Sequence, residues 1–379
     1  MLFQLTEEHL MIRKAARDFA QQECLPGVIE RDEKAQFPKE QIRKLGELGF
    51  MGMMVDPQYG GSGMDTISYV LAMEEISKVE ASVSVCMSVN NSLVCWGLEK
   101  FGSEAQKQKY LTPLAKGEVI GAFLLSEPEA GSDATSQRTV AEDHGDHYLV
   151  SGTKNWITNG ASASIYLVMA QTHPSKGSHG INVLIIERDS PGVTVAAKEN
   201  KMGIRASDTC SILFTDVRVP KENRIGDDGF GFTFAMKTLA GGRIGIASQA
   251  LGIASGAYER ALAYAKERKA FGTEIMNHQA IAFKLADMAT RIEAARLLIF
   301  KSAWEKDNGI DYTTSSSMAK VFASETAMWV TTEAVQIHGG YGYVKEYHVE
   351  RLMRDAKITQ IYEGTSEVQR IVISRSILK

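Results

Sequence analysis

The pattern of apolar and polar residues divides the chain into a helical region, a region of short strands and a second helical region. Apolar residues with helical spacing recur from residue 1 to about 120. Short aliphatic or aromatic runs replace them from 121 to about 226, and helical spacing then returns. The pattern therefore predicts an α+β protein with an N-terminal all-helical domain (1–120), a middle β-domain (121–226) and a C-terminal helical domain (227–379).

The middle region contains five runs that are typical of β-strands. They are rich in β-branched and aromatic residues and are separated by Gly, Asp, Asn and Pro. The runs are Gly121–Leu125, His147–Val150, Ser164–Met169, Ile181–Ile186 and Ser211–Val219. Because no helical pattern lies between them, they predict an antiparallel barrel or sandwich of roughly 100 residues.

The last region predicts a bundle of long helices. One apolar face recurs at spacings of 3, 4, 3 and 4 residues, through Leu285, Met288, Ile292, Ala295 and Ile299. Gly309 follows as a helix stop, and residues 313–335 form a second helical pattern rich in Ala, Met and Phe. Such faces suit a four-helix bundle.

Composition and charge narrow the class of protein. Of the 379 residues, 44% are hydrophobic and 23% are charged, as in ordinary globular proteins. The net charge of −4 leaves no excess of cations for a phosphate backbone, which argues against nucleic acid binding. No apolar run approaches the roughly 18 residues that span a bilayer. Residues 1–9 have neither a basic leader nor an apolar signal core, so we expect a cytoplasmic protein without membrane insertion.

The cysteines and histidines show no spacing typical of metal ligands. Cys24, Cys86, Cys95 and Cys210 form neither a paired motif nor a disulfide framework. The eight histidines are scattered along the chain. We therefore expect reduced, mostly buried thiols and no metal site.

A short stretch near the C-terminus contains a local candidate for chemistry. A helical pattern over residues 350–358 runs toward Gly364, and Ser366 begins a second helix with a capping-box pattern. Glu363 therefore lies at a break between two helices, next to the apolar ring of Tyr362. A carboxylate in such a place is a candidate general base with a raised pKa, and the alternative is a glutamate that caps a surface turn.

Five motifs are spread along the chain: Ser126–Asp133, Lys154–Gly160, Arg268–Gly272 followed by His278 and Gln279, Gln336–Gly342, and Ile361–Ser366. Their residues, their order and the helical–β–helical layout closely resemble the flavin-dependent acyl-CoA dehydrogenases over essentially the whole chain. The run Ser88–Leu93 and the C-terminal helices are most similar to the short-chain, butyryl-CoA branch. The chain has no glycine-rich strand–turn–helix unit of the Rossmann type, since Gly339–Gly342 follows a helical pattern.

The resemblance implies both the reaction and the base. Members of this family remove a proton from the α-carbon of an acyl-CoA and a hydride from the β-carbon, which leaves a trans-2-enoyl-CoA. Glu363 matches the catalytic base, and its backbone N–H would bind the enolate oxygen together with a flavin ribityl hydroxyl. Tyr362 matches a side chain that keeps water from the enolate. The resemblance also places Ser132, Arg243 and Gly364 at the substrate.

One group of FAD contacts implied by the resemblance lies in the middle domain. The hydroxyl of Thr158 would face the flavin N5, which receives the hydride. Trp156 would cover the ring system, and Ser126 would bind its pyrimidine edge. The other members of this group are Phe123, Leu125, Gly131, Ser132 and Ile157, of which Ser132 also matches a contact to pantetheine or the CoA diphosphate.

A second group of FAD contacts includes residues that reach the cofactor of a neighbouring subunit. Arg268 would bind its diphosphate, where a fixed cationic fork is suited. Phe271 reaches across in the same way, and Thr365 would meet a phosphate or the adenine at the start of a helix. The other members are Gln279, Gln336, Ile337, Gly339, Gly340 and Glu367. Because these sites are completed across subunits, the resemblance implies a homotetramer, built as a dimer of dimers.

Three positions differ from other branches of the family. Gly242, just before Arg243, lies where isovaleryl-CoA dehydrogenases carry their base, so we expect the base at Glu363. Ala240 replaces an Asp that many members use near CoA. Near Ser84 the chain offers no cation for an acidic acyl tail, which disfavours glutaryl-CoA.

The sequence therefore predicts FAD-dependent dehydrogenation of short acyl-CoA, with electrons passed to electron-transfer flavoprotein. One alternative is a dehydrogenase for branched short acyl groups. Another is an acyl-CoA oxidase that uses O2, although oxidases usually continue further than a chain that stops at Lys379. A third is a non-catalytic helical binding protein, against which the presence of Glu363, Thr158 and Arg268 argues.

Overall fold

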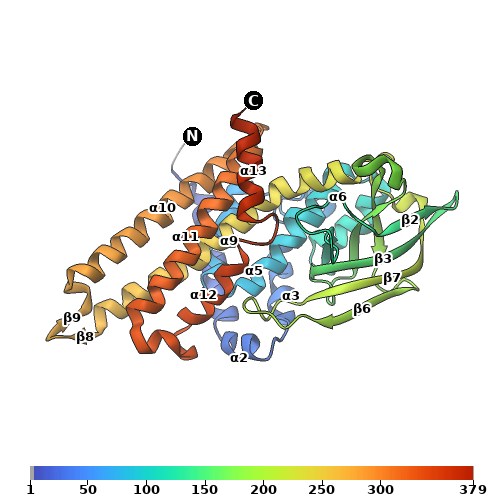
Figure 1. Cartoon of the computed structure of the whole chain (residues 1–379). Helices are drawn as coiled ribbons and strands as arrows, with labels where there is room; N and C mark the ends of the chain where they lie inside the picture. The colour runs from blue at the N-terminus through green and yellow to red at the C-terminus, as the bar shows by residue number, and fades with distance from the viewer. Residues whose placement is uncertain (1–3, 379) are drawn as a thin grey trace.

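The computed structural model describes residues 4–378 and shows a β-sheet region beside a body of helices (Figure 1). The N-terminal helices are α1 (Glu7–Phe19), α2 (Val28–Glu33), α3 (Lys39–Glu47), α4 (Thr66–Ser77), α5 (Ala81–Ser88), α6 (Trp96–Phe101), α7 (Glu104–Gln106) and α8 (Thr112–Ala115). Single-turn π segments join several of them: η1 (Ala20–Cys24), η4 (Val89–Cys95) and η5 (Lys107–Leu111). Thr6 caps α1, since its hydroxyl accepts a hydrogen bond of 3.2 Å from the His9 backbone N–H.

The segment Ala81–Phe101, which contains α5, η4 and α6, is the one described segment that is long and apolar enough to cross a membrane. However, 94% of its most apolar window is buried inside the protein. Core helices of water-soluble proteins pass the same test of length and composition, so this segment is weak evidence for a membrane span.

The middle region forms a curled, seven-stranded sheet. Its strands are β1 (Gly121–Leu124), β2 (Val140–Asp143), β3 (His147–Thr158), β4 (Ile165–Gln171), β5 (Ile181–Glu187), β6 (Val193–Lys198) and β7 (Thr209–Pro220). The strand order is β1-β4-β2-β3-β7-β6, and β5 pairs with β4. All five predicted runs overlap strands to within one residue, whereas β2 and β6 were not predicted. The α+β class with a middle β-domain is therefore confirmed.

The sheet differs in one respect from the predicted antiparallel arrangement. The pairs β2–β3, β3–β7, β4–β5 and β6–β7 are antiparallel. In contrast, β1 runs parallel to β4, and β2 meets β4 in one parallel pair. Parallel neighbours need a crossover connection. Here the long loop after β1 and the β2–β3 hairpin provide that crossover.

The C-terminal region consists of long helices with one small hairpin. Its helices are α9 (Gly231–Glu267), α10 (Gln279–Asp307), α11 (Thr313–His338), α12 (Val349–Ile358) and α13 (Ser366–Ile377), and the hairpin consists of β8 (Lys269–Ala270) and β9 (Thr273–Glu274). The predicted apolar face of α10 is buried, with every member at most 7% exposed. α9, α10 and α11 pack against one another, and α4 also packs against α9.

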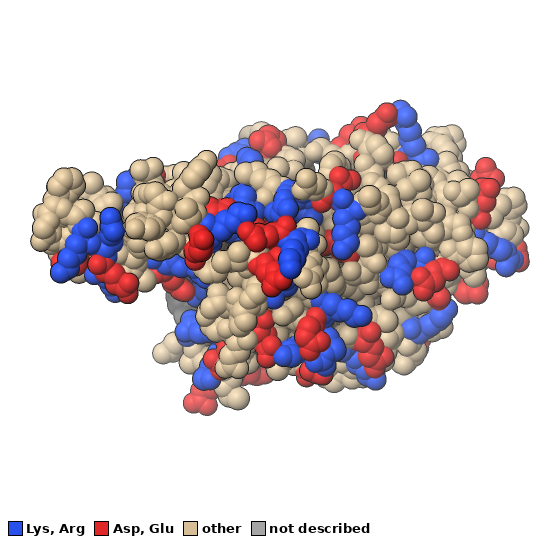
Figure 2. Space-filling view, turned by 90° about the horizontal axis from the view of Figure 1, so that it is seen from below, with Lys and Arg blue, Asp and Glu red and all other residues tan. Residues whose placement is uncertain are grey.

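The three regions share a continuous core. One cluster of buried apolar side chains includes Ala16 from α1, Val168 from β4 and Ile299 from α10. A largely buried ion pair also joins the two helical regions, Arg354 of α12 with Asp32 of α2 at 2.7 Å. On the face shown in Figure 2, acidic and basic side chains are interspersed, without a large area of one sign. The charge distribution on this face does not suit a polyanion.

Candidate active site

The candidate base lies in a strained turn between two helices. α12 ends at Ile358 and α13 begins at Ser366. In the connecting turn, Glu363 has a φ of 50° and Gly364 a φ of 91°, both in the left-handed region. A glycine adopts this conformation readily, whereas for a glutamate it is unfavourable and requires support from the surrounding structure.

The start of α13 differs from the predicted capping box by one residue. The N-cap is Thr365, whose hydroxyl accepts a hydrogen bond of 3.2 Å from the Val368 N–H, so the predicted cap at Ser366 was wrong. The side-chain amide of Gln369 instead donates to the backbone carbonyls of Glu363 and Gly364, at 3.1 and 3.0 Å. Thr365 and Glu367 both lie in this first turn, close in sequence to the base.

The Glu363 carboxylate points at a glycine on α9. A Cβ atom built on Gly242 would lie 2.1 Å from Glu363 Oε2 and 2.8 Å from a methyl carbon of Leu93. The absence of a side chain at Gly242 therefore makes room for the carboxylate. This is the same position at which another branch of the family was expected to carry its base, so α9 and the turn at Glu363 face one site.

Burial raises the pKa of the Glu363 carboxyl group into the range of a base that works at neutral pH. Although the residue as a whole is half-buried, its Oε2 atom is enclosed and has no hydrogen-bond partner among residues 4–378. Burial raises the pKa of Glu363 to about 7, opposed by the positive charges of Lys320 and Arg243. A carboxylate with this pKa can accept a proton at neutral pH, as the sequence prediction required.

The pH dependence of catalysis should report this raised pKa. Since the base must be ionised, kcat/KM is expected to fall about tenfold per pH unit below pH 7 and to level off above it. The measurement is a pH profile of kcat/KM with a saturating electron acceptor. A profile that stays flat down to about pH 5, near the value of an unperturbed carboxyl group, would contradict this assignment.

Filling the space at Gly242 should impair the base without unfolding the protein. In Gly242→Ala the new methyl group forces the Glu363 carboxylate to move, and we expect turnover to fall about 10²-fold. Gly241→Ala is the matched control, because its Cβ would meet only the Tyr312 hydroxyl, at 3.8 Å. Equal turnover in the two variants would show that the space at Gly242 has no importance for catalysis.

Two predicted substrate contacts are packed around the base. Arg243 is only 6% exposed, and it donates from Nη1 to the Ser317 hydroxyl at 3.2 Å, while its Nε has no partner among the described residues. Burial lowers the pKa of Arg243. The Tyr362 hydroxyl donates to the Gln249 side chain, which anchors the ring beside the turn. Arg243 thus lies inside the protein and acts on Glu363 through its charge.

The predicted FAD contacts of the middle domain lie on two adjacent segments. Lys154 Nζ donates to the Leu125 carbonyl at 3.1 Å, and the Asn155 N–H donates to the Ser126 carbonyl at 2.9 Å. β3 bulges between Lys154 and Ile157, and this bulge turns Trp156 outward. Trp156 is 61% exposed with a φ of 62°, an uncommon conformation for a bulky residue. An exposed indole held in this way suits a planar ring system that would cover it.

The other predicted residues of this group have different environments. Ile157 is buried, while Thr158 is half-buried at the end of β3, paired with Thr209. Phe123 is half-buried and stacks on Phe234 of α9. Gly131 and Ser132 are exposed in the loop after β1.

Four residues of the second predicted FAD group line a groove at the far end of α9, whereas Thr365 and Glu367 lie at the start of α13. Arg268, Ile337, Gly339 and Gly340 all border this groove, whose volume is about 490 Å³. The Arg268 guanidinium lies 5.5 Å from the centre of the Tyr341 ring. Gln279 and Gln336 are exposed at the adjoining ends of α10 and α11, and Phe271 is 97% exposed at the tip of the β8–β9 hairpin.

The FAD contacts of the middle domain and the groove around Arg268 lie near opposite ends of α9. α9 has 37 residues and spans about 55 Å, with the sheet near its first residues and the β8–β9 hairpin after its last (Figure 1). Arg268 and Phe271 are therefore too far from Trp156 and Thr158 to contact the same cofactor within one chain. The sequence prediction that these residues serve a neighbouring subunit is compatible with this separation.

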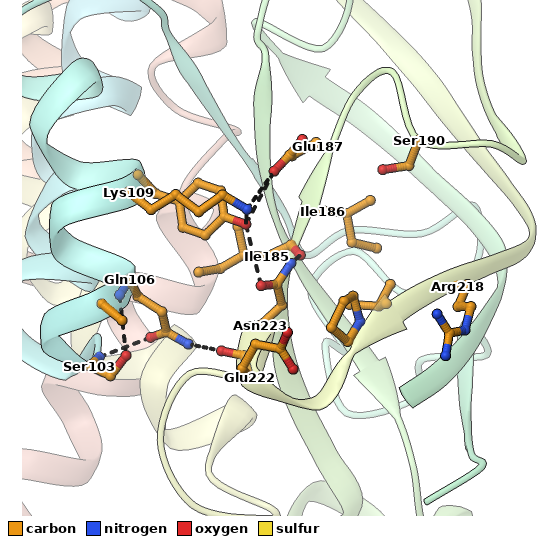
Figure 3. A pocket seen from close by; sticks show the side chains of 14 residues that line it. Ser103, Gln106, Lys109, Ile185, Ile186, Glu187, Ser190, Arg218, Glu222 and Asn223 are labelled. Atoms are coloured by element: carbon orange, nitrogen blue, oxygen red, sulfur yellow. Dashed lines mark hydrogen bonds and ion pairs between the residues drawn. The ribbon is translucent and has the colours of Figure 1, made fainter. Parts of the chain in front are cut away.

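Figure 3 shows a separate groove, of about 410 Å³, between the η5 segment and the sheet. Its polar side chains pair with one another: Lys109 contacts the Tyr110 hydroxyl and the Glu187 carboxylate. The Gln106 amide donates to the Glu222 carbonyl. None of the predicted site residues lines this groove.

The described residues contain no metal centre and no disulfide. Among residues 4–378, no three His, Cys, Asp or Glu side chains gather in a way that could hold a metal ion. All four cysteines are buried free thiols, as predicted. His338 has a structural environment, because its ring stacks on Tyr264 at 4.3 Å and its Nδ1 bonds the Ala334 carbonyl.

The enclosed Glu363 carboxylate has the properties of a general base, and the exposed Trp156 indole suits a planar cofactor. Both features fit an oxidoreductase that acts on a carbon acid. Three family models cover almost the whole chain: "Acyl-CoA dehydrogenase, N-terminal domain" matches residues 6–118, the middle domain residues 122–217 and the C-terminal domain residues 229–378. The chain belongs to the acyl-CoA dehydrogenase family. Members of this family depend on FAD, so the cofactor prediction is confirmed.

The chain is similar to relatives over its full length. It is 51% identical to the short-chain specific acyl-CoA dehydrogenase of Clostridium acetobutylicum, with 100% of both chains covered. It is 50% identical to the butyryl-CoA dehydrogenase of Megasphaera elsdenii, whose structure superposes with a TM-score of 0.99 over 100% of both chains. A chain in a structural study of the electron transferring flavoprotein of Acidaminococcus fermentans gives the same identity, TM-score and coverage.

Proposed function

We propose that this protein is an FAD-dependent short-chain acyl-CoA dehydrogenase, which converts butyryl-CoA or a similar acyl-CoA to the trans-2-enoyl-CoA with Glu363 as the base. The observation that carries the proposal is the enclosed Glu363 carboxylate, whose pKa is raised to about 7 and which faces Gly242. Membership of the family supports the reaction class. The names of the relatives from Clostridium acetobutylicum and Megasphaera elsdenii support a short acyl chain.

In this proposal the protein supplies the base, the alignment of the thioester and a site without water. The Glu363 carboxylate accepts the α-proton, and the Glu363 backbone N–H donates to the thioester oxygen as the enolate forms. Tyr362 closes the side of the turn, and the positive charges of Lys320 and Arg243 favour the ionised form of Glu363 against the effect of burial. Bound FAD supplies the acceptor for the hydride from the β-carbon.

The residues that would hold FAD are the two groups already described. Trp156 and Thr158 would meet the ring system, and Ser126 its edge, because these segments are adjacent and partly exposed. Arg268 would bind the FAD diphosphate of a second copy. Exposed apolar or aromatic side chains support a subunit contact there: Tyr341 and Val344 line the groove, and Phe271, Met276, Phe283 and Tyr343 lie on the adjoining hairpin, loops and first turns of α10. We infer a homotetramer built as a dimer of dimers.

The proposed electron acceptor is an electron-transfer flavoprotein. The structural relative from a study of the electron transferring flavoprotein of Acidaminococcus fermentans supports this choice. We also propose a cytoplasmic location, as the sequence predicts.

Anaerobic mixing with butyryl-CoA tests the proposed function. The purified yellow protein should lose its flavin absorbance, and a later addition of electron-transfer flavoprotein should restore it. In air, release of hydrogen peroxide at the rate of enoyl-CoA formation would show an oxidase instead. Protein that neither contains nor takes up FAD would contradict the proposal and favour a binding protein.

A further inference from the structure

A buried lysine contacts the turn that carries the base. Lys320 lies on α11 and is fully buried, and its Nζ donates to the Gly364 carbonyl at 2.6 Å. No carboxylate in residues 4–378 lies within 4 Å of this Nζ. An ammonium group without a close ion-pair partner is unfavourable inside a protein, because burial removes its hydration. Its single hydrogen bond to the turn therefore indicates a specific role there.

The Glu363–Gly364 turn depends on donors from two helices. Both residues have left-handed φ values, and their carbonyl groups follow the end of α12, where no backbone N–H of a further helical turn in the described chain donates to them. Gln369 from α13 donates to both carbonyls, and Lys320 from α11 donates a charge-assisted bond to the second. Lys320 thus links the strained turn to the buried face of α11.

Lys320 also faces the carboxylate as a charge. Two cations oppose the effect of burial on the pKa of Glu363. Lys320 lowers this pKa more than Arg243 of α9 does. Burial lowers the pKa of Lys320 to about 8, so the ammonium form predominates at neutral pH. The other ionisable groups that interact with this pair are Tyr362 beside the base, Tyr69 of α4 and Glu367 of α13.

We propose that Lys320 is a positioning residue for the reaction: its bond to the Gly364 carbonyl fixes the turn that aims Glu363, and its positive charge favours the ionised form of the Glu363 carboxylate. This inference rests on the proposed role of Glu363 as the base. Lys320 itself need not touch the substrate, because its Nζ is bonded to the Gly364 carbonyl. It acts through the backbone and the electrostatic potential of the turn.

The test uses the FAD-loaded enzyme and the rate of anaerobic flavin reduction by butyryl-CoA as a function of pH. Lys320→Met removes both the bond and the charge. We expect the limiting rate to fall about 10- to 100-fold and the acid limb of the profile to move up by about one pH unit. The dissociation constant for butyryl-CoA should change little. Ser324→Ala is the matched control, since Ser324 is equally buried on α11 but bonds only the Val321 carbonyl of its own helix.

Two further variants separate the bond from the charge. Lys320→Gln retains a donor without the charge, so the acid limb should move up while the rate above it falls less than in Lys320→Met. Gln369→Leu removes the neutral donor, so the rate should fall while the acid limb stays in place. If Lys320→Met does not fold, the position of the acid limb in Lys320→Gln decides the question.

The inference and the proposed function fail in different ways. An unchanged acid limb and an unchanged limiting rate in the lysine variants would overturn the role of Lys320, even if Glu363→Gln is inactive. Activity that survives in Glu363→Gln would instead overturn the assignment of the base. If the rate falls but the acid limb does not shift in either lysine variant, Lys320 contributes through packing alone. That result would contradict its electrostatic role.

Discussion

Replacing Glu363 with Gln is expected to slow flavin reduction by butyryl-CoA about 10³- to 10⁴-fold, the full contribution of a positioned general base. The amide has nearly the same shape as the carboxylate and still fits beside Gly242, but it cannot accept the α-proton. FAD content and butyryl-CoA binding should therefore remain close to those of the unaltered enzyme. The measurement is the single-turnover rate of flavin bleaching under anaerobic conditions.

Glu363→Asp is the informative companion variant. It keeps a carboxylate but shortens the side chain by one methylene, which withdraws the base from the substrate by about 1.5 Å. We expect an intermediate rate, because a displacement of this order costs about 10²-fold. Flavin bleaching at the normal rate in Glu363→Gln would show that another group removes the proton.

Replacing Arg268 with Met is expected to weaken FAD binding about 10- to 100-fold, the effect of losing one charge-assisted contact to a diphosphate. The predicted contact reaches the cofactor of a second copy, since α9 keeps Arg268 far from the sheet of its own chain. Purified Arg268→Met should therefore contain less FAD, while its acyl-CoA site is intact. Titration of the apoprotein with FAD measures the change.

Lys266→Met is the control for the loss of one positive charge at this end of α9. Lys266 is also exposed and lies in the last turn of the same helix, so this variant removes an equal charge from the same end of the molecule. Sedimentation of both variants reports whether the assembly persists. Equal FAD affinity in the two variants, with the tetramer preserved, would contradict the role of Arg268.

The sequence predicted the layout of the fold but not all of its strands. The five runs and the apolar face of α10 were recognisable because burial on one or both faces leaves a clear apolar pattern. β6 has a mostly half-exposed or exposed pattern at one edge of the sheet, and β2 has only two apolar residues before Glu142 and Asp143, so neither produces such a run. The parallel pairing of β1 with β4 depends on a long-range crossover, which local patterns do not contain.

The candidate site shows the same division between local and long-range information. The helix break at Glu363 follows from local residues, yet the cap fell on Thr365 because adjacent hydroxyl residues can both cap a helix. From the sequence, Gly242 was recognised only as a position that lacks the base of another branch. The fold shows in addition that the absence of a side chain there makes room for the Glu363 carboxylate. The sequence analysis did not identify Lys320. Its helical spacing from Ser316 and Ala323, which are both buried, could have indicated a charged residue on a buried helix face.

The proposal of a short-chain acyl-CoA dehydrogenase is tested most directly by a series of acyl-CoA substrates from C4 to C16, assayed with an artificial electron acceptor. We predict the highest kcat/KM with butyryl-CoA and a steady decline as the acyl chain lengthens. A maximum at C8 or beyond, or no enoyl-CoA formed from any member of the series, would contradict the proposal.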